Sequence, residues 1–378
     1  MRGKVLIVAS VASVVDQFNK ENIKILHQLG FKVFVAANFS SGNTSSKTRL
    51  DSFLDELRKI EVKVWNIPFP RKLKIIQLVR SYFALKRIIQ ADYYNIIHCH
   101  NPIASFILRL IFIFNKKSQI TKIIYTAHGF HFFKEAPLKN WFIYFPMEKI
   151  MSFYTDVLIT INNEDYQRAK SSFKNIPKIK KIDGVGIDTK KFSPLSSKEE
   201  KIKIRKKLSL DTKAFILISI AELNKNKNKI FIIEMLQILK KSKKNFLLLL
   251  VGLGDEEKKL IKVIKNYSLE KHVIFLGYRN DTDDLLKASD LFVTSSFREG
   301  LPVSVIEAIA VGLPIIASNN RGHRDLVKNK LNGIILNNYN PHSFCDEVVY
   351  LIENKNKIEE FSNYNLKFVN KFSSNSIN

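Results

Sequence analysis

The sequence predicts an α/β fold of two doubly wound domains, and two observations carry this prediction. First, short runs of β-branched and other apolar residues alternate with longer amphipathic stretches. Nearly continuous apolar runs are typical of strands buried on both faces, and their alternation with helices indicates a parallel sheet covered on both sides. Second, the alternation is interrupted once, at 183–194, and then restarts. The 378 residues allow two domains of roughly 150 residues or more each.

The predicted strands divide between the two halves of the chain. In the first half they cover 5–9, 32–36, 62–67, 96–98, 122–126 and 157–160. In the second half they cover 214–219, 246–251, 273–275, 291–294, 314–317 and 333–336. Helical periodicity predicts amphipathic helices at 17–29 and 50–59, and a basic helix at 198–208.

The interruption contains Gly184, Gly186 and Pro194 and shows no periodicity, which is typical of a linker. We therefore place the two domains at 1–186 and 187–378. In doubly wound sheets, ligands bind beyond the carboxyl ends of the strands. We expect the two domains to face each other across a cleft.

The first apolar run has two interpretations. Arg2 and Lys4 precede the apolar residues 5–15, which is also the pattern of a secretory signal peptide. We favour a buried first strand and its following loop, because the strand–helix alternation starts there and continues in phase.

Composition excludes several classes of protein. The apolar content of 46% is too high for a disordered chain, and no apolar run reaches the ~20 residues of a membrane span. The two cysteines, Cys99 and Cys345, exclude a disulfide framework and predict reduced thiols in a cytoplasmic protein.

The formal net charge of +26 comes mostly from lysine, and a solvated lysine-rich surface explains much of it. The densest basic stretch, 71–90, has no acidic residue. Apolar residues recur in it at helical spacing, which predicts a helix with one buried face and a cationic margin that could rest on an anionic membrane surface. No nucleic-acid-binding motif accompanies the charge, so we expect no nucleic-acid partner. The basic residues are Arg71, Lys72, Lys74, Arg80, Lys86 and Arg87, and the apolar ones are Ile75, Ile76, Val79 and Phe83.

The most informative segment is 295–318, which predicts a strand, a glycine-containing turn, a helix beginning at Pro302 and another strand. The free amide groups of Val303 and Ser304 at the start of that helix would form an anion site. Glu299 precedes the helix and Glu307 lies within it. Two carboxylates beside an anion site suit hydrogen bonds to sugar hydroxyls.

This segment resembles the signature of the GT-B-fold glycosyltransferases of family 4, which contains two glutamates separated by seven residues. The resemblance covers nearly the whole chain and is strongest to bacterial enzymes of capsule and exopolysaccharide assembly. The other matching segments are 126–131, 186–194, 221–227, 320–324 and 332–333. The resemblance implies the GT-B fold, with two Rossmann-like domains that bind the acceptor (N-terminal) and the nucleotide sugar (C-terminal).

The resemblance also implies roles for individual residues. Glu307 would bind the ribose, and Glu299 would hold hydroxyls of the transferred sugar. Lys227 would neutralise charge on the leaving diphosphate, and His128 would contact the donor sugar or shape the acceptor side. The backbone of Gly300, Leu301, Val303 and Ser304 would contact the diphosphate.

The sequence departs from the family pattern in three places. Glu222 occupies a position where many relatives have a diphosphate-binding Arg, and Arg298, Arg321 and Arg324 are candidate replacements, with Arg298 assigned to the donor site. The usual glycine pair of the first loop is replaced by 10–13. The chain also stops near the point where relatives run a last helix, and its last ~15 residues could pack back on the N-terminal domain.

Two patterns could indicate a metal. The first consists of His98, His100, His128 and His131, but no carboxylate or second cysteine completes a known spacing. The second is the Asp-x-Asp of 281–284, which we interpret as the start of a helix at 283–288. We therefore predict no metal and no cofactor.

The sequence thus predicts a retaining, metal-independent glycosyltransferase. We expect it to move a sugar from a nucleotide sugar, with UDP favoured by the resemblance, to an undecaprenyl-linked glycan in surface polysaccharide synthesis. It would be cytoplasmic and peripheral at the inner face of the cell membrane. The alternatives are a non-catalytic, membrane-associated GT-B scaffold and a related enzyme that phosphorolyses or epimerises its sugar.

Overall fold

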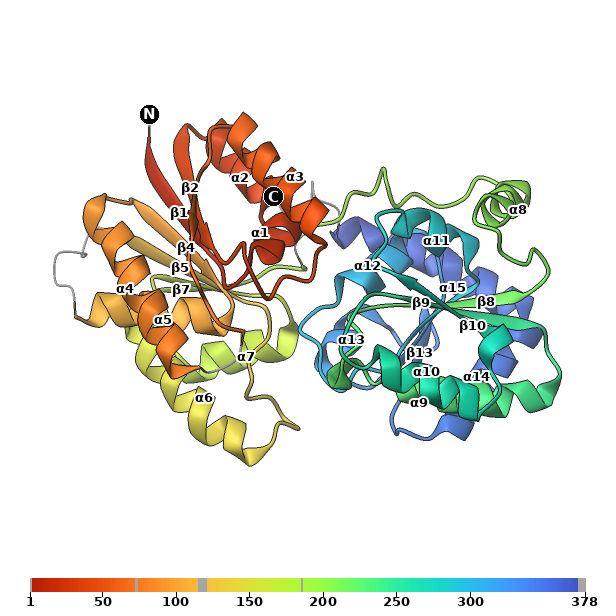
Figure 1. Ribbon diagram of the computed structural model, residues 1–378. Coiled ribbons are helices and arrows are strands. Elements are labelled where there is room, and N and C mark those ends of the chain that lie inside the picture. The colour runs from red at the N-terminus through yellow and green to blue at the C-terminus, as the bar shows by residue number, and fades with distance from the viewer. Residues whose placement is uncertain (1, 72–73, 115–120, 185, 373–378) are drawn as a thin grey trace. The chain divides into compact units, whose positions relative to one another are not determined.

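The computed structural model describes residues 2–71, 74–114, 121–184 and 186–372. The chain divides into two compact units, Met1–Val185 (unit 1) and Gly186–Asn378 (unit 2), and each is described by itself below (Figure 1).

Unit 1 is built on a seven-stranded sheet in the order β3-β2-β1-β4-β5-β6-β7, in which each adjacent pair is parallel. This is a doubly wound order, because the chain moves outward from β1 in one direction and then returns to build in the other. The strands are β1 (Gly3–Val8), β2 (Phe31–Ala37), β3 (Lys63–Asn66), β4 (Ile96–His100), β5 (Lys122–Ala127), β6 (Val157–Thr160) and β7 (Lys178–Lys181).

Helices cover both faces of this sheet, and a separate apolar core fills each side. On one face, Val15, Ile23 and Phe53 pack with Ile7 and Val35; these three residues lie in α1 (Ala12–Phe18), α2 (Lys20–Gln28) and α3 (Lys47–Lys59). The other face carries the larger core. It is covered by α4 (Ile75–Ala91), α5 (Pro102–Ile113), α6 (Leu138–Met151) and α7 (Asn163–Ser172), with the 3-10 turn η2 (Ser152–Tyr154) after α6.

The buried first strand is confirmed, since β1 lies in the middle of the sheet. The loop expected after it is shorter than predicted, because α1 already begins at Ala12. Two details differ from the sequence prediction. The helix expected at 17–29 is two helices, α1 and α2, which meet at Asn19. Strand β7 was not predicted, because its sequence, KIKK, has one apolar residue and it lies at the sheet edge.

The prediction for the basic helix was wrong about which face is buried. Helix α4 begins at Ile75 and buries Ser81 and Leu85. The apolar residues expected in the core, Ile75, Ile76, Val79 and Phe83, are exposed, with Ile75 at 79% and Phe83 at 62%. The basic margin is present: Arg71, Lys74, Arg80 and Arg87 are exposed and Lys86 is half-buried. Lys72 lies outside the described residues.

Unit 2 contains a six-stranded parallel sheet in the order β10-β9-β8-β11-β12-β13, again doubly wound. Its strands are β8 (Phe215–Ile220), β9 (Phe246–Val251), β10 (Val273–Gly277), β11 (Leu291–Thr294), β12 (Ile315–Ser318) and β13 (Gly333–Leu336). All six strands lie within one or two residues of the predicted positions.

The helices of unit 2 lie on the two faces of the sheet (Figure 1). They are α8 (Lys198–Lys207), α9 (Lys229–Leu239), α10 (Glu257–Asn266), α11 (Thr282–Ala288), α12 (Val303–Ala310), α13 (Arg321–Leu326), α14 (Pro341–Glu353) and α15 (Lys355–Phe368). The short 3-10 turns are η3 (Lys225–Lys227), η4 (Lys240–Ser242), η5 (Glu270–His272) and η6 (Val369–Phe372). The described part of the chain's end, η6, packs against α12 and α15 of its own unit.

Within the described ranges, no helix has both the length and the apolar content needed to span a bilayer.

A buried ion pair joins two helices of unit 1. Arg109 of α5 donates from Nη1 and Nη2 to the carboxylate of Glu148 in α6, at 2.9 and 3.2 Å. The Arg109 guanidinium also lies over the Tyr125 ring, 4.3 Å from its centroid. Both charged side chains are almost fully inaccessible to solvent. Removing either one would therefore leave the other charge buried without a partner.

We predict that Glu148→Gln lowers the free energy of unfolding of unit 1 by about 3–5 kcal/mol, because it leaves the Arg109 charge buried and uncompensated. The measurement is denaturant unfolding followed by tryptophan fluorescence. The control is the double variant Arg109→Met/Glu148→Leu, which removes both charges and should lose less stability than the single variant. Equal losses in the two variants would contradict the ion-pair account.

Candidate active site

In unit 2, the strand order reverses between β8 and β11, which are neighbours in the sheet. The loop that follows β8 and the loop that follows β11 therefore leave the same sheet edge side by side. In doubly wound sheets this reversal is where ligands bind. The predicted site residues Lys227 and Glu299 lie on these two loops.

Side-chain and backbone hydrogen bonds join the two loops. The Ser295 hydroxyl donates to the carbonyl oxygen of Asn228 at 2.8 Å and to that of Lys227 at 3.2 Å. The Asn226 amide donates to the carbonyl oxygen of Arg298 at 2.9 Å. The β8 loop itself turns tightly at η3, where the Asn224 side chain accepts from the Lys227 amide at 3.1 Å. Lys227 is thus held at a fixed place on the rim of the sheet.

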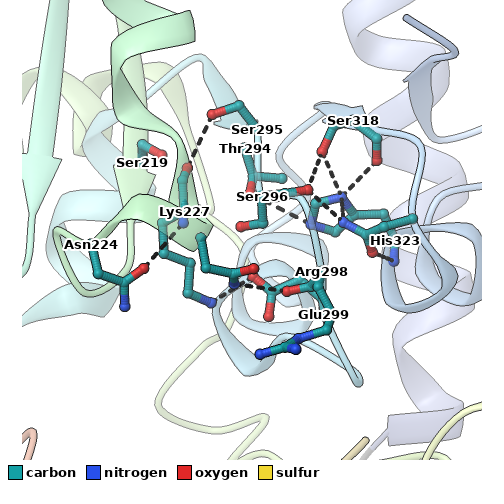
Figure 2. Close-up of polar contacts among 12 residues, drawn as sticks. Ser219, Asn224, Lys227, Thr294, Ser295, Ser296, Arg298, Glu299, Ser318 and His323 are labelled. Carbon is teal, nitrogen blue, oxygen red and sulfur yellow. Dashed lines mark hydrogen bonds and ion pairs between the residues drawn. The ribbon is translucent and has the colours of Figure 1, made fainter. Parts of the chain in front are cut away.

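Lys227 and Glu299 form an ion pair with Nζ and Oε1 2.5 Å apart (Figure 2). Both side chains are largely shielded from solvent. Burial, the largest single influence, would raise the pKa of Glu299. The charge of Lys227, the electrostatic effect of His323 and the hydrogen bonds from Lys227 and Ser296 together outweigh burial and hold the pKa below its ordinary value. Glu299 is therefore a carboxylate at neutral pH.

The chain segment carrying Glu299 rests against the start of α13. Arg321 Nε donates to the Glu299 carbonyl oxygen at 3.2 Å. A Cβ on Gly322 would lie 2.8 Å from the Glu299 Cβ and 2.8 Å from the carbonyl oxygen of Gly300. Because only a glycine fits this approach, Gly322 allows the Glu299–Gly300 backbone to pack directly on α13.

A buried polar network adjoins the start of this segment at Ser296 (Figure 2). The Ser296 carbonyl oxygen accepts from the Ser318 hydroxyl at 2.7 Å and from the Asn320 amide at 2.9 Å. His323 is fully buried, and its Nδ1 lies 2.7 Å from the carbonyl oxygen of Ser318. Burial lowers the pKa of His323 to about 4, so His323 is neutral and serves as a structural hydrogen-bonding group.

Helix α12 begins as predicted after Pro302, which is its N-cap residue. The first backbone bonds of the helix run from Val305 and Ile306 to the Pro302 carbonyl oxygen, so the amides of Val303 and Ser304 lie outside the helical ladder, as expected for a helix start. Gly300 and Leu301 precede them in the same loop.

Glu307 lies within α12 and is partly buried. Burial raises its pKa to about 7, although the charge of Lys191 opposes this shift. At neutral pH the side chain is thus a mixture of acid and carboxylate. Both forms can hydrogen-bond to hydroxyl groups.

A second lysine lies under the site. Lys229 is buried at the start of α9 and donates to the Ser219 hydroxyl at the end of β8. Burial, reinforced by the charge of Lys227, lowers its pKa to about 7. A cavity of about 200 Å³ adjoins this lysine and is lined also by Asn224, Asn228 and Phe297. Glu299 and Glu307 are not among the residues that line this cavity.

The arginines considered as replacements at Glu222 have different environments. Arg321 is buried against Glu299, as described above. Arg324 donates from Nη1 to the Asn319 side chain at 2.8 Å. Arg298 is partly exposed on the β11 loop itself. Of the three, Arg298 is the one whose own loop carries Glu299.

In unit 1, the strand order reverses between β1 and β4. Three histidines cluster at β4 and at the end of the adjacent strand β5. His100 Nδ1 lies 3.1 Å from His128 Nε2, and His98 Nε2 lies 2.8 Å from the Thr126 hydroxyl. Burial lowers the pKa of His98 and of His128 to about 4, so both are neutral at physiological pH.

The backbone that follows His128 and the His128 ring are both held by contacts within unit 1. Gly129 has φ = 134°, a conformation that favours glycine. The Phe130 amide donates to the buried Asp165 carboxylate at 3.0 Å, and Phe18 packs against the His128 ring with centroids 5.2 Å apart.

In the part of the chain that the structure describes, no group of three or more His, Cys, Asp or Glu side chains is arranged to hold a metal ion. His131 lies against Tyr144 and not with the other histidines. Asp281 is the N-cap residue of α11, one residue earlier than expected, and its carboxylate pairs with Arg279 in place of capping the helix. Metal independence stays a prediction.

Two family models match the chain. The model "Glycosyl transferases group 1" matches residues 200–368 and the model "Glycosyltransferase Family 4" matches residues 18–182. A candidate glycosyltransferase of Bacillus subtilis (strain 168), EpsD, is 37% identical over 89% of this chain and 84% of its own length. The chain belongs to glycosyltransferase family 4. It is a glycosyltransferase with the GT-B fold.

Two further comparisons show which proteins this glycosyltransferase is similar to. The UDP-Gal:α-D-GlcNAc-diphosphoundecaprenol α-1,3-galactosyltransferase of Escherichia coli is 29% identical over 81% of this chain and 78% of its own length. The crystal structure of Anabaena Alr3699/HepE in complex with UDP-glucose matches with a TM-score of 0.75 and 19% identity. It covers 100% of this chain and 97% of the Anabaena chain, and at this identity the match concerns the fold.

The structure brings together the predicted unit 2 residues of the glycosyltransferase: Lys227 with Glu299 directly, and Gly300, Leu301, Val303, Ser304 and Glu307 along one loop and helix. Sequence reasoning missed Lys229, Gly322 and His323 as supports of the site. The segment 320–324 was recognised as a family match, which was a signal for Gly322 and His323. Lys229 gave no signal, because it lies in a lysine-rich run.

Proposed function

We propose that this glycosyltransferase moves a sugar from a nucleotide sugar, with UDP as the favoured nucleotide, to an undecaprenyl-diphosphate-linked glycan, with retention of configuration and without a metal. The single observation that carries the proposal is the Lys227–Glu299 ion pair at the strand-order reversal of unit 2. It combines a cation for a diphosphate with a carboxylate for sugar hydroxyls, at the start of a helix whose first amides suit a phosphate.

The donor would bind along the β11 loop and α12. Gly300, Leu301, Val303 and Ser304 would donate backbone hydrogen bonds to the diphosphate, and Glu307 would accept from the ribose hydroxyls. Arg298 would add a second positive charge on the diphosphate side. Glu299 would orient the transferred sugar through its hydroxyls, with Lys227 beside the bond that breaks.

In the proposed reaction, the acceptor hydroxyl attacks the anomeric carbon from the face on which the diphosphate departs. The bond between that carbon and the diphosphate oxygen breaks, and a diphosphate oxygen takes the hydroxyl proton. Lys227 stabilises the negative charge that develops on the diphosphate. This charge stabilisation by side chains and helix amides supports a reaction that needs no metal ion.

We assign His128 of unit 1 to contact with a sugar hydroxyl. Its low pKa supports this role, because a neutral imidazole can either donate or accept a hydrogen bond. The His100 ring, 3.1 Å away, would fix the orientation of the His128 ring.

The acceptor assignment rests on the Escherichia coli relative, whose name specifies a diphosphoundecaprenol-linked sugar. Such an acceptor lies in a membrane, so we also propose that the protein is peripheral at the inner face of the cell membrane and acts in capsule, exopolysaccharide or related surface glycan synthesis. The exposed arginines and apolar residues of α4 support this location, since this combination binds anionic bilayer surfaces. A non-catalytic scaffold is the alternative, and the experiments below distinguish it.

We predict that Glu299→Gln retains nucleotide binding but reduces the transfer rate by about 10²–10³-fold, a loss typical of removing one electrostatic group from a reacting centre. The measurement is kcat for sugar transfer beside the dissociation constant for the nucleotide, which should change by only a few-fold. The matched control is Glu270→Gln, at an exposed carboxylate of the same unit. Unchanged turnover in Glu299→Gln would remove Glu299 from the mechanism.

We predict that affinity for the nucleotide sugar rises by roughly tenfold from pH 6 to pH 8, because a Glu307 with a pKa of about 7 goes from mostly protonated to mostly ionised and accepts from both ribose hydroxyls only when ionised. The sign for folding is opposite. The pKa of Glu307 is higher in the folded protein than in the unfolded chain. Its contribution to the free energy of unfolding is therefore fully present below the ordinary carboxyl pKa and is lost as pH rises through about 7.

This pH dependence is measured by calorimetry with a nucleotide sugar, whose diphosphate does not titrate in that range. Glu307→Gln should bind more weakly at pH 8 and show no rise. A rise of the same size in Glu307→Gln would assign the titration to another group.

A further inference from the structure

Helix α6 of unit 1 presents an apolar stripe to solvent. Leu138 is 75% exposed and Phe142 is 77% exposed, and Ile143 and Ile150 are more than half exposed. Pro146 is exposed between them. The spacing of four residues from Leu138 to Phe142, Pro146 and Ile150 places these side chains along one side of the helix. We refer to Leu138, Phe142, Ile143, Pro146 and Ile150 as the α6 stripe.

The opposite side of α6 is fixed to the domain, so the stripe cannot turn inward. Glu148 is held by the buried ion pair with Arg109. The Trp141 indole donates to the Phe133 carbonyl oxygen at 3.2 Å and packs against Phe132 and Phe145. A helix that is apolar on every side is normally buried. In α6, one side makes the buried contacts with unit 1, and the opposite side, which carries the α6 stripe, remains exposed and can contact a partner.

The surroundings of the stripe favour a bilayer as that partner. Within α6, the one fully exposed charged residue is Lys139, which is basic. Helix α5 packs against both α4 and α6, and α4 carries its own exposed apolar residues together with Arg80 and Arg87 and no acidic residue. In the loop just before α6, Lys134 and Glu135 are both exposed, so bases outnumber acids around the stripe. Exposed apolar groups beside an excess of bases match the acyl chains and anionic headgroups of a membrane surface.

We propose that the α6 stripe inserts into the interfacial layer of an anionic bilayer and anchors unit 1 there. This inference rests on the proposed function, because a lipid-linked acceptor lies in a membrane. It adds that helix α6 makes the apolar contact with that membrane. Helix α6 is drawn in yellow beside α5 in Figure 1. The basic residues of α4 would supply the salt-sensitive part of the binding and the α6 stripe the salt-resistant part.

The test is co-sedimentation of the full chain with vesicles of phosphatidylglycerol and phosphatidylcholine, at low salt and at 0.5 M NaCl. We expect Phe142→Glu/Ile143→Glu to lower the bound fraction at both salt concentrations, with the partition coefficient reduced by ~10-fold or more. The matched control is Leu331→Glu/Tyr350→Glu, at two exposed apolar residues of unit 2, which should bind as the wild type does. Arg80→Glu/Arg87→Glu should lose binding mainly at low salt.

A second measurement locates the helix in the bilayer. Phe142→Trp should gain fluorescence that is quenched by lipids brominated along the acyl chain, whereas Tyr350→Trp should not. Both signals are compared with the wild type, whose two tryptophans give the background.

Other outcomes would overturn the inference. If Phe142→Glu/Ile143→Glu sediments with vesicles as the wild type does, the stripe is not the anchor. A second copy of the chain covers the stripe if two results are found together: the wild type does not bind vesicles, and it is a dimer that this variant converts to a monomer. Nucleotide binding reports on unit 2 and should be unchanged in the α6 variants, so failure here is distinguishable from failure of the proposed transfer.

Discussion

The reversal of strand order between β8 and β11 is the constraint on which the site of unit 2 depends. Two loops that are about 70 residues apart in the chain leave the sheet at adjacent strand ends, and this brings Lys227 to Glu299. The Ser295 hydroxyl and the Asn226 amide tie the loops together, and the ion pair closes the connection.

Close backbone packing makes this arrangement possible. A Cβ on Gly252 would lie 2.1 Å from the Ala221 carbonyl oxygen, and one on Gly254 would lie 2.2 Å from that of Leu223. These glycines let the β9 loop rest directly on the β8 loop, in the same way that Gly322 lets α13 rest on the Glu299 segment. The site is therefore built on rigid backbone contacts and its charged side chains need little reorganisation, which is what electrostatic stabilisation of a transition state requires.

The fold was largely predictable because the strands are buried on both faces and read as nearly continuous apolar runs, as in LLLLV of β9. Strand β7 was not predicted because an edge strand that faces solvent can consist almost entirely of lysine. Helix α4 shows a different limit. It has apolar residues on two sides, Leu78 and Leu85 facing the core and Val79 and Phe83 facing solvent. Periodicity identifies such a helix but does not determine which side the domain buries.

The candidate site also contains residues that the local sequence indicates and residues that it does not. Glu299 and Glu307 could be found from their spacing around a helix start, because that geometry is local. Lys229, Gly322 and His323 act through contacts with segments distant in the sequence, and their residue types alone are common. Burial also decides the charge of these groups: it raises the pKa of Glu307 and lowers that of Lys229, each to about 7, and no feature of the sequence near them indicates this.

The measurement that tests the central claim most directly is thermal unfolding of the purified protein with UDP, GDP, ADP or CMP, each with Mg²⁺ and with a chelator in its place. The account predicts that one nucleoside diphosphate raises the unfolding midpoint equally in both conditions. A ligand at 100 times its dissociation constant adds about 2.7 kcal/mol to the folded state, which is enough to see. No rise with any nucleotide, or a rise that requires Mg²⁺, would contradict a metal-independent donor site at Lys227 and Glu299.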